Sequence, residues 1–251
     1  MKWFTLFLIC PNELNVNEMK LLVTDCGTTE YATLWEKQQK LLDARVEGRI
    51  GDVLLLTEHT NVYTLGKSAD PNHLVANEQY LASHEIDVVA TDRGGDITYH
   101  GPGQLVVYPI ISLENFGKDI HLYLRNLEQA IIEMLETYGV ASRHDDQYTG
   151  VWVGEKKIAS IGIKVRKWVT MHGAAINIST DLSYFDGIIA CGIFHRGMTS
   201  LSREIVESIS PEVVRDKFVQ SFCSVFTYEP EYVSFDLLMS MLHEKKEIAF
   251  A

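Results

Sequence analysis

The most informative stretch of this 251-residue sequence reads Arg93-Gly94-Gly95-Asp96-Ile97-Thr98-Tyr99-His100-Gly101-Pro102-Gly103-Gln104. Four glycines and one proline fall within these twelve residues, and glycine lets a backbone adopt positive φ and approach a ligand closely. An ordinary surface loop explains the glycines and the proline, but not the arginine, threonine, tyrosine, histidine and glutamine among them. The patterns of a P-loop and of a Rossmann dinucleotide site are absent. We therefore predict a binding loop between two strands.

Outward from this loop, the chain mixes strand and helix patterns. Short apolar runs predict strands at Lys20–Thr24, Val53–Thr57, Val62–Leu65, Ile86–Thr91, Leu105–Ile111 and Val169–Ile178, with a hairpin formed by Tyr148–Val153 and Lys157–Val165. Helical spacing of apolar residues predicts helices over Thr29–Glu47, from Leu124 to a C′ glycine at Gly139, from Pro211 onward, and over Phe235–Lys245. No linker rich in Pro, Gly or Ser divides the chain, so we predict one α+β domain over residues 19–251. The sequence leaves open whether the part after about Thr199 forms a small appended subregion.

The composition is that of an ordinary globular protein, with 46% hydrophobic and 22% charged residues. The formal net charge of −12 argues against nucleic acid as the main ligand, because nucleic-acid binding favours a basic surface. The nine histidines and four cysteines lack the spacing of metal ligands, so no metal site is predicted. The cysteines are expected to be reduced thiols.

Residues 1–18 are predicted to be an N-terminal extension outside the fold. The apolar run Trp3–Cys10 follows Lys2 and faintly resembles a signal peptide. Its eight residues are too few to span a bilayer, and no cleavage site of small residues follows. We therefore expect a cytoplasmic protein whose first strand begins near Met19.

Three further segments carry candidate functional residues, and each has an ordinary structural explanation on its own. A lysine at a hairpin turn is usually solvated, a histidine beside glycine is more often structural than catalytic, and a cysteine between small residues is often a buried apolar group. The segments are Lys156-Lys157-Ile158-Ala159-Ser160-Ile161-Gly162, His172-Gly173-Ala174-Ala175-Ile176-Asn177 and Ile188-Ile189-Ala190-Cys191-Gly192-Ile193.

In their order and spacing, the binding loop and these three segments resemble the lipoyl(octanoyl) transferase family. Residues 93–104 fit the family's RGG-x-x-TYHGPGQ loop throughout, and residues 157–162 fit its KIA-S/A-x-G strand. Residues 172–177 fit its segment from HG to Asn, and the Cys191-Gly192 pair is followed by the expected Thr199-Ser200-Leu201. The resemblance extends from about residue 19 to about residue 226. One departure is Ala190, where the family usually has a proline that would restrain φ.

The resemblance implies an α+β fold with a mixed β-sheet flanked by helices, like the catalytic domain of biotin and lipoate protein ligases. It also implies transfer of an octanoyl group from octanoyl-acyl carrier protein to a lysine of lipoyl domains. The acceptors would be E2 subunits of 2-oxoacid dehydrogenases and the glycine cleavage H protein. No ATP, metal or other cofactor would be needed.

The resemblance assigns the catalytic chemistry to two residues. Cys191 would be the nucleophile that forms an acyl-thioester, and Lys157 would lower the pKa of that thiol and exchange protons. Lys156 is the rival for the second role, although strand alternation points the two lysines to opposite faces. The substrate-binding residues would be Arg93, Gly94, Gly95, Asp96, Ile97, Thr98, Tyr99, His100, Ser160, Ile161, Gly162, His172, Gly173 and Ala174. Backbone N–H groups near Gly162, Gly173 or Gly192 are candidates for stabilising the oxyanion.

Docking poses a difficulty, because acyl carrier proteins and lipoyl domains are usually acidic and this chain is acidic too. The cluster Lys164, Arg166 and Lys167 is one candidate docking surface, and a solvated strand end explains it equally well. We expect a monomer that binds neither membranes nor nucleic acid. The alternatives are an ATP-dependent lipoate or octanoate ligase, a transferase between lipoyl-bearing proteins, a thioester hydrolase, and an inactive relative that only binds acyl or lipoyl proteins.

Overall fold

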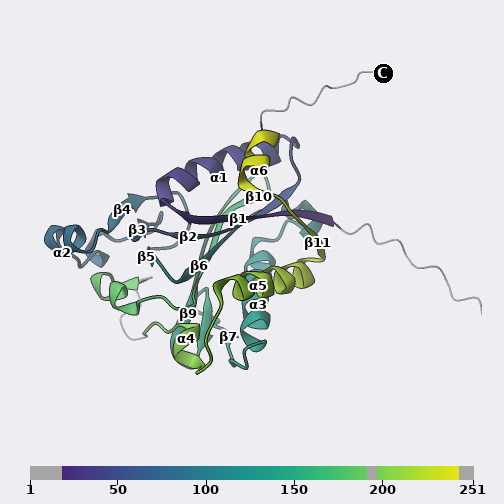
Figure 1. Cartoon of the computed structure of the whole chain (residues 1–251). Coiled ribbons are helices and arrows are strands. Elements are labelled where there is room, and N and C mark those ends of the chain that lie inside the picture. The colour runs from purple at the N-terminus through teal and green to yellow at the C-terminus, as the bar shows by residue number, and fades with distance from the viewer. Residues whose placement is uncertain (1–18, 191–196, 243–251) are drawn as a thin grey trace, which may run out of the picture.

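An eight-stranded sheet runs through the middle of the computed structural model, which describes residues 19–190 and 197–242 (Figure 1). The strand order is β11-β1-β2-β6-β10-β9-β8-β7. The β11–β1 and β1–β2 pairs are parallel and the other neighbours are antiparallel, so the sheet is mixed, as the resemblance implies. The strands are β1 (Met19–Thr29), β2 (Asp52–His59), β6 (Gln104–Ile110), β7 (Arg143–His144), β8 (Val151–Val153), β9 (Lys156–Arg166), β10 (Val169–Asn177) and β11 (Tyr228–Tyr232).

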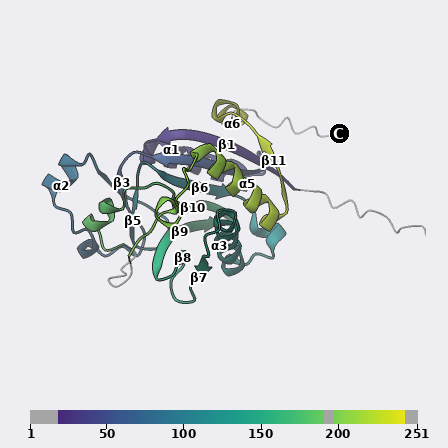
Figure 2. The same ribbon diagram turned by 60° about the horizontal axis from the view of Figure 1, so that its bottom comes forward.

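Helices cover both faces of this sheet. Helix α1 (Tyr31–Val46) packs on one face, and α3 (Ile120–Glu136) and α5 (Pro211–Phe226) lie side by side on the other (Figure 1 and Figure 2). Strand β2 shows why both faces are covered, because its side chains alternate between the two cores. Shorter helices are α2 (Glu78–Ser83), α4 (Leu201–Glu204) and α6 (Phe235–Met241). None of the helices in the described ranges is long and apolar enough to cross a membrane.

A second, three-stranded sheet lies beside the first, with the order β4 (Asp87–Ala90), β3 (Val62–Leu65), β5 (Ile97–His100). Strand β5 falls inside the stretch that the sequence predicts to be a loop, so that prediction is wrong for these four residues. The physical reason is alternation: Ile97 and Tyr99 enter a third, aromatic core, which gives this short run the burial pattern of a strand.

The other predicted helices and strands are present in the structure, with shifted boundaries. The predicted C′ glycine, Gly139, has φ 72°. Its N–H donates to the carbonyl of Glu136 at 2.9 Å, and the N–H of Val140 donates to that of Leu135 at 3.2 Å, which is the Schellman pattern. Helix α5 begins at Pro211 as predicted. Helix α6 begins at Phe235 as predicted but ends at Met241 with Leu242 as its C-cap, and residues 243–245 of the predicted range lie outside the described residues.

The segment after Thr199 belongs to the main sheet and its core. Helix α5 packs against α3, and β11 pairs with β1 at the sheet edge. Strand β11 was not predicted because its sequence, Tyr-Glu-Pro-Glu-Tyr, has little apolar patterning. A proline is tolerated there because an edge strand needs hydrogen bonds on one side only. The extension predicted at residues 1–18 lies outside the described residues.

Candidate active site

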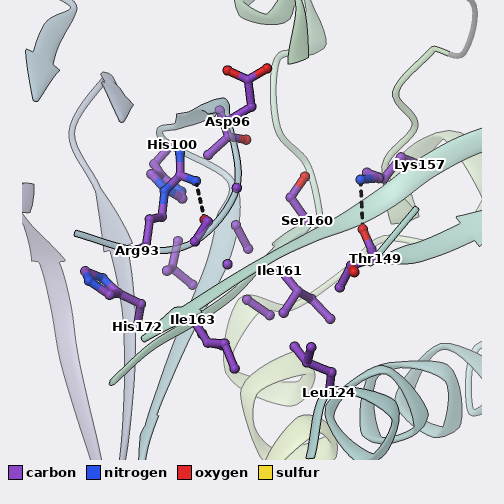
Figure 3. A pocket seen from close by; sticks show the side chains of 18 of the residues that line it. Arg93, Asp96, His100, Leu124, Thr149, Lys157, Ser160, Ile161, Ile163 and His172 are labelled. Atoms are coloured by element: carbon purple, nitrogen blue, oxygen red, sulfur yellow. Dashed lines mark hydrogen bonds between the residues drawn. The ribbon is translucent and has the colours of Figure 1, made fainter. Parts of the chain in front are cut away.

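A cavity of about 520 Å³ lies where β9 and β10 meet the loop that begins at Arg93 (Figure 3). Helix α1 contributes Tyr31 to its wall, β6 contributes Val106 and Tyr108, and α3 contributes Leu124. All of the predicted substrate-binding residues line it except Ile97 and Tyr99. The structure therefore brings three of the four sequence segments to one hollow.

Ile97 and Tyr99 are directed away from this cavity. Both are buried in the aromatic core of the smaller sheet, where the Tyr99 ring lies 6.0 Å from that of Tyr63. The Tyr99 hydroxyl donates to Asn61 Oδ1 at 2.9 Å. Because successive side chains of a strand face opposite ways, Thr98 and His100 face the cavity while their neighbours support the strand.

Lys157 lies in the cavity wall and Lys156 does not. The Lys157 side chain is 3% exposed, and its Nζ donates to the carbonyl oxygen of Thr149 at 3.0 Å (Figure 3). The same Nζ lies 5.0 Å from the centre of the Trp152 ring. Lys156 is exposed to solvent. A buried ammonium needs such partners, and its position favours Lys157 over Lys156 for chemistry inside the cavity.

The segment 191–196 lies outside the described residues, and with it lie Cys191 and Gly192. The described chain on either side of the segment is held by backbone hydrogen bonds. Before the segment, the N–H of Ile189 donates to the carbonyl of His73 at 2.8 Å. After it, the N–H of Lys157 donates to the carbonyl of Gly197 at 3.0 Å, and that of Thr199 donates to the carbonyl of Lys157 at 2.9 Å. The chain that follows the segment thus lies directly beside Lys157.

Gly162 and Gly173 are required by packing. A Cβ on Gly162 would lie 2.8 Å from the carbonyl oxygen of Gly94, and one on Gly173 would lie 2.1 Å from that of Val107. The two glycines face each other in the β9–β10 ladder. The carbonyl of Ile163 accepts from the N–H of Gly94, so the backbone groups of Ile163 point away from β10. Successive residues of a strand point their backbone groups to alternate sides, so Gly162 points toward β10 and forms a hydrogen-bonded pair with Gly173. The N–H groups of both glycines are therefore occupied and poorly suited to bind an oxyanion.

Arg93 organises the loop from within. Its side chain is 7% exposed, and Nη2 donates to the carbonyl oxygen of Thr64 at 2.6 Å and to the Thr64 hydroxyl at 2.9 Å. Nη1 donates to the carbonyl of Gly94 at 3.1 Å. A guanidinium presents several donors in a fixed plane, so it ties the loop to β3 and lends its positive charge to the cavity wall.

Away from Lys157, the cavity wall is backed by aromatic and imidazole rings. The Tyr31 ring stacks on that of His100 with centroids 5.7 Å apart, and His59 lies 5.2 Å from Tyr31. His59 Nδ1 donates to the carbonyl of Thr29 at 3.0 Å, so its Nε2 accepts from the Tyr108 hydroxyl at 2.7 Å. Burial lowers the pKa of His59 to about 4 and holds that of His100 well below its ordinary value. These imidazoles are neutral at pH 7.

His172 completes this side of the cavity. It adopts φ 59°, a left-handed conformation that costs energy for a residue with a Cβ. Its Nε2 donates to Asp92 Oδ1 at 2.7 Å, and its backbone N–H donates to Gln38 Oε1 at 3.2 Å. Burial lowers the pKa of His172 to about 4, although Asp92 opposes the shift. Burial alone would raise the pKa of Asp92, but hydrogen bonds from Lys164 and His172 outweigh it and keep this carboxylate ionised.

Sequence reasoning missed several residues of this site because they come from separate elements. Tyr31, His59 and Tyr108 stand alone in the sequence, in patterns that predict only core helix or strand. Asp92 directly precedes the binding loop, and its carboxyl beside Arg93 was the available signal.

The basic cluster considered for docking carries less free positive charge than its sequence indicates. Lys164 forms an ion pair with Asp92, and Arg166 forms one with Asp43. Two of the three cations are thus balanced by carboxylates of the same chain, which weakens the cluster as a docking surface.

The sequence profile of the lipoyl protein ligase A/B catalytic domain matches residues 30–223, which is most of the chain. The chain belongs to this family. Two of its relatives, both named octanoyltransferase, confirm the resemblance. The relative from Flavobacterium johnsoniae is 42% identical over 84% of this chain and 98% of its own length. The relative from Rubrobacter xylanophilus is 48% identical over 79% of this chain and 90% of its own.

A solved structure supports the fold of the lipoyl protein ligase family. A putative lipoate protein ligase from Thermoplasma acidophilum, with bound lipoic acid, superposes with a TM-score of 0.69. The match covers 90% of this chain and 93% of that one, at 17% identity. The α+β fold with a mixed sheet and flanking helices, predicted from the resemblance, is therefore confirmed.

Proposed function

We propose that this chain transfers an octanoyl group from the thioester of an acyl carrier protein to a lysine of lipoyl domains, through an acyl-thioester on Cys191. The observation that carries the proposal is the buried Lys157, which shares one cavity with residues of the binding loop 93–104, the signature loop of the family. The polypeptide segment that contacts Lys157, residues 197–199, is the one that follows Cys191 in the sequence. Relatives that match nearly their whole length to this chain are named octanoyltransferase.

In the first step, the Cys191 thiolate attacks the thioester carbonyl of the donor. A bond forms between that carbon and Cys191 sulfur, and the bond to the donor sulfur breaks. Lys157 favours the thiolate electrostatically and gives a proton to the departing donor thiolate. One thioester replaces another, so the step is close to isoenergetic and needs no ATP.

In the second step, the acceptor lysine attacks the acyl-enzyme as a free amine. A carbon–nitrogen bond forms and the bond to Cys191 sulfur breaks. Lys157, having lost its proton in the first step, takes one from the attacking nitrogen, so the protons balance over the cycle. An amide is more stable than a thioester, which drives the transfer forward.

The cavity suits a medium-length acyl chain. Its volume of about 520 Å³ lies in the range of small-molecule sites, about 300–1,000 Å³. The acyl tail would contact the apolar and small side chains of the cavity wall, which are Val106, Ile161, Ile163, Ala174 and Ala175. Each buried methylene contributes about 0.8 kcal/mol, so such a wall favours an acyl tail over a polar one.

The proposed acceptors are E2 subunits of 2-oxoacid dehydrogenases and the glycine cleavage H protein. We also propose that the protein is a monomer and acts in the cytoplasm. The chief rival is an ATP-dependent ligase of the same family, which would activate free octanoate as an adenylate and would need no cysteine.

A transfer assay separates these functions. Purified protein is mixed with octanoyl-acyl carrier protein and a lipoyl domain, without ATP, and the lipoyl domain is weighed by mass spectrometry. We expect one octanoyl group on the lipoyl domain, and none when its target lysine is replaced by arginine. Modification that requires ATP and free octanoate would establish the ligase instead. Loss of the donor thioester with no change in the lipoyl domain would indicate a hydrolase.

A further inference from the structure

A chain of buried hydrogen bonds leads from the cavity wall toward Lys157. It begins at Arg93, whose Nη2 donates to the Thr64 hydroxyl at 2.9 Å. The Thr64 hydroxyl lies 3.3 Å from His100 Nε2, and His100 Nδ1 lies 2.9 Å from Gln104 Oε1. Each of these side chains is at most 7% exposed, so water does not compete for the contacts.

The series of hydrogen bonds continues from β6 to β10. Gln104 Nε2 donates to Asn177 Oδ1 at 2.9 Å, and Asn177 Nδ2 donates to the carbonyl oxygen of Thr199 at 3.0 Å. The N–H of Thr199 donates to the carbonyl of Lys157 at 2.9 Å. Asn177 is therefore the side chain that connects the signature loop to the chain leaving segment 191–196.

The links share one direction of donation. Arg93 can only donate, so the Thr64 hydroxyl accepts from it and gives its own proton to His100 Nε2. His100 then carries its proton on Nδ1 and donates to the Gln104 carbonyl oxygen. Gln104 and Asn177 each accept with the oxygen and donate with the nitrogen of their amide. The Gln104 Nε2 also donates to the carbonyl of Tyr99 at 3.2 Å. Turning over the Asn177 amide would break two contacts and turning over the Gln104 amide would break three, so these hydrogen bonds fix both orientations.

We propose that Gln104 and Asn177 are positioning residues for the reaction at Lys157. They hold Thr199, and with it residues 197–199, against the start of β9, from which the Lys157 side chain enters the cavity. Neither side chain lines the cavity, so neither is expected to touch the acyl group. The inference rests on the proposed function, because that function makes Lys157 the group that exchanges protons.

Asn177→Ala tests the last side-chain link, with Thr170→Val as the matched control. Thr170 is buried in the same strand, and its hydroxyl donates to the carbonyl of Pro109 at 2.7 Å. We expect Asn177→Ala to lower kcat roughly 10- to 100-fold, because a small displacement at a reacting centre is costly, with an unchanged KM for the octanoyl donor. Thr170→Val should lower the melting temperature and leave kcat near the wild-type value.

Gln104→Met provides a second variant that does not depend on how well Asn177→Ala folds. If the two residues act through one chain, the double variant loses no more kcat than the more impaired single variant. A further readout is the pH dependence of Cys191 alkylation by iodoacetamide, located by peptide mapping. We expect the profile to move to higher pH in Asn177→Ala and Gln104→Met, because Lys157 is less well placed beside the thiol.

Three results would overturn the proposal: equal kcat in Asn177→Ala and Thr170→Val, additive losses in the double variant, or alkylation profiles that coincide with that of the wild type. Failure of the proposed function would look different, since the wild-type protein itself would then transfer no octanoyl group. The alkylation profiles need no substrate, so they decide the positioning role in that case as well.

Discussion

The lysine on one side of the cavity and the histidines on the other are held in opposite charge states. On one side, Lys157 is buried beside the Thr149 carbonyl and the Trp152 ring, two partners that favour an ammonium. On the other side, burial lowers the pKa of His59 and His172 to about 4, so these imidazoles are neutral at pH 7. Figure 3 shows Lys157 and His172 on opposite sides of the hollow.

This difference teaches how one small cavity can combine reaction and binding. Proton exchange needs a protonated group close to the reacting sulfur, whereas an octanoyl tail is best received where the histidines add no further charge. The following predictions test whether the division between the two sides holds, from the largest expected effect to the smallest.

Replacing Lys157 should have the largest effect. Lys157→Met keeps much of the side-chain volume and removes the ammonium, so we expect kcat for transfer to fall by about 10²–10⁴-fold. Lys156→Met is the matched control, because Lys156 is exposed at the neighbouring position. The measurement is single-turnover acylation with octanoyl-acyl carrier protein. Equal losses in the two variants would remove Lys157 from the chemistry.

The neutral imidazoles predict a fall in stability on acidification. His59 and His172 have a pKa of about 4 in the folded protein, against an ordinary value of 6.5. The unfolded chain therefore binds more protons between these values, and the free energy of unfolding decreases as pH falls from 6.5 to 4. Each histidine accounts for at most about 3 kcal/mol.

Urea unfolding at several pH values measures this slope. His59→Gln should reduce the dependence of the free energy of unfolding on pH. His121→Gln is the control, because His121 is exposed, and it should leave this dependence unchanged. A slope that His59→Gln does not alter would mean that His59 is not the group whose protonation destabilises the fold.

Narrowing the binding side should change chain-length preference without removing activity. Ala175 lines the cavity and is 4% exposed, so Ala175→Leu would occupy space that the acyl tail needs. We expect kcat/KM for octanoyl donors to fall roughly tenfold or more relative to hexanoyl donors, since a methylene in an apolar pocket has effects of this size. Ala159→Leu is the control, because Ala159 is buried in the neighbouring strand and does not line the cavity. This variant should lower kcat/KM for octanoyl and hexanoyl donors alike. A preference that Ala175→Leu leaves unchanged would place the acyl tail elsewhere.

Surface charge outside the cavity should matter least. Arg166 already pairs with Asp43, whereas Lys167 has no carboxylate partner among the described residues. We therefore expect Lys167→Glu to raise KM for octanoyl-acyl carrier protein only about two- to fivefold at low salt, with the effect disappearing at high salt. Lys40→Glu on α1 makes the same change in net charge and is the control. A rise beyond tenfold, specific to Lys167, would make the basic cluster the main docking surface.

The sequence predicted most of the frame because strong local patterns agree with the packing. Strand β2 is apolar on both faces and is buried by helices on both sides. Gly139 and Pro211 mark helix ends through backbone conformation alone. Strand β11 escaped prediction because an edge strand with a proline needs little apolar patterning.

The candidate site was predictable only in part, because a motif is read along the chain whereas a cavity is formed by contacts across it. The resemblance assigned Thr98 and Tyr99 to the substrate alike, and strand alternation sends them to opposite sides. Tyr31 reaches the site through tertiary packing and a contact with His172, which leave no trace in local sequence, whereas Asp92 is marked only by its place beside Arg93.

The acyl-enzyme is the most direct test of the account as a whole. The wild-type protein is incubated with octanoyl-acyl carrier protein, without acceptor or ATP, and its intact mass and modified peptide are determined. We predict a gain of one octanoyl group on Cys191, its disappearance when a lipoyl domain is added, and much slower formation in Lys157→Met than in Lys156→Met. Absence of the adduct, with labelling of the lipoyl domain only when ATP and free octanoate are supplied, would contradict it.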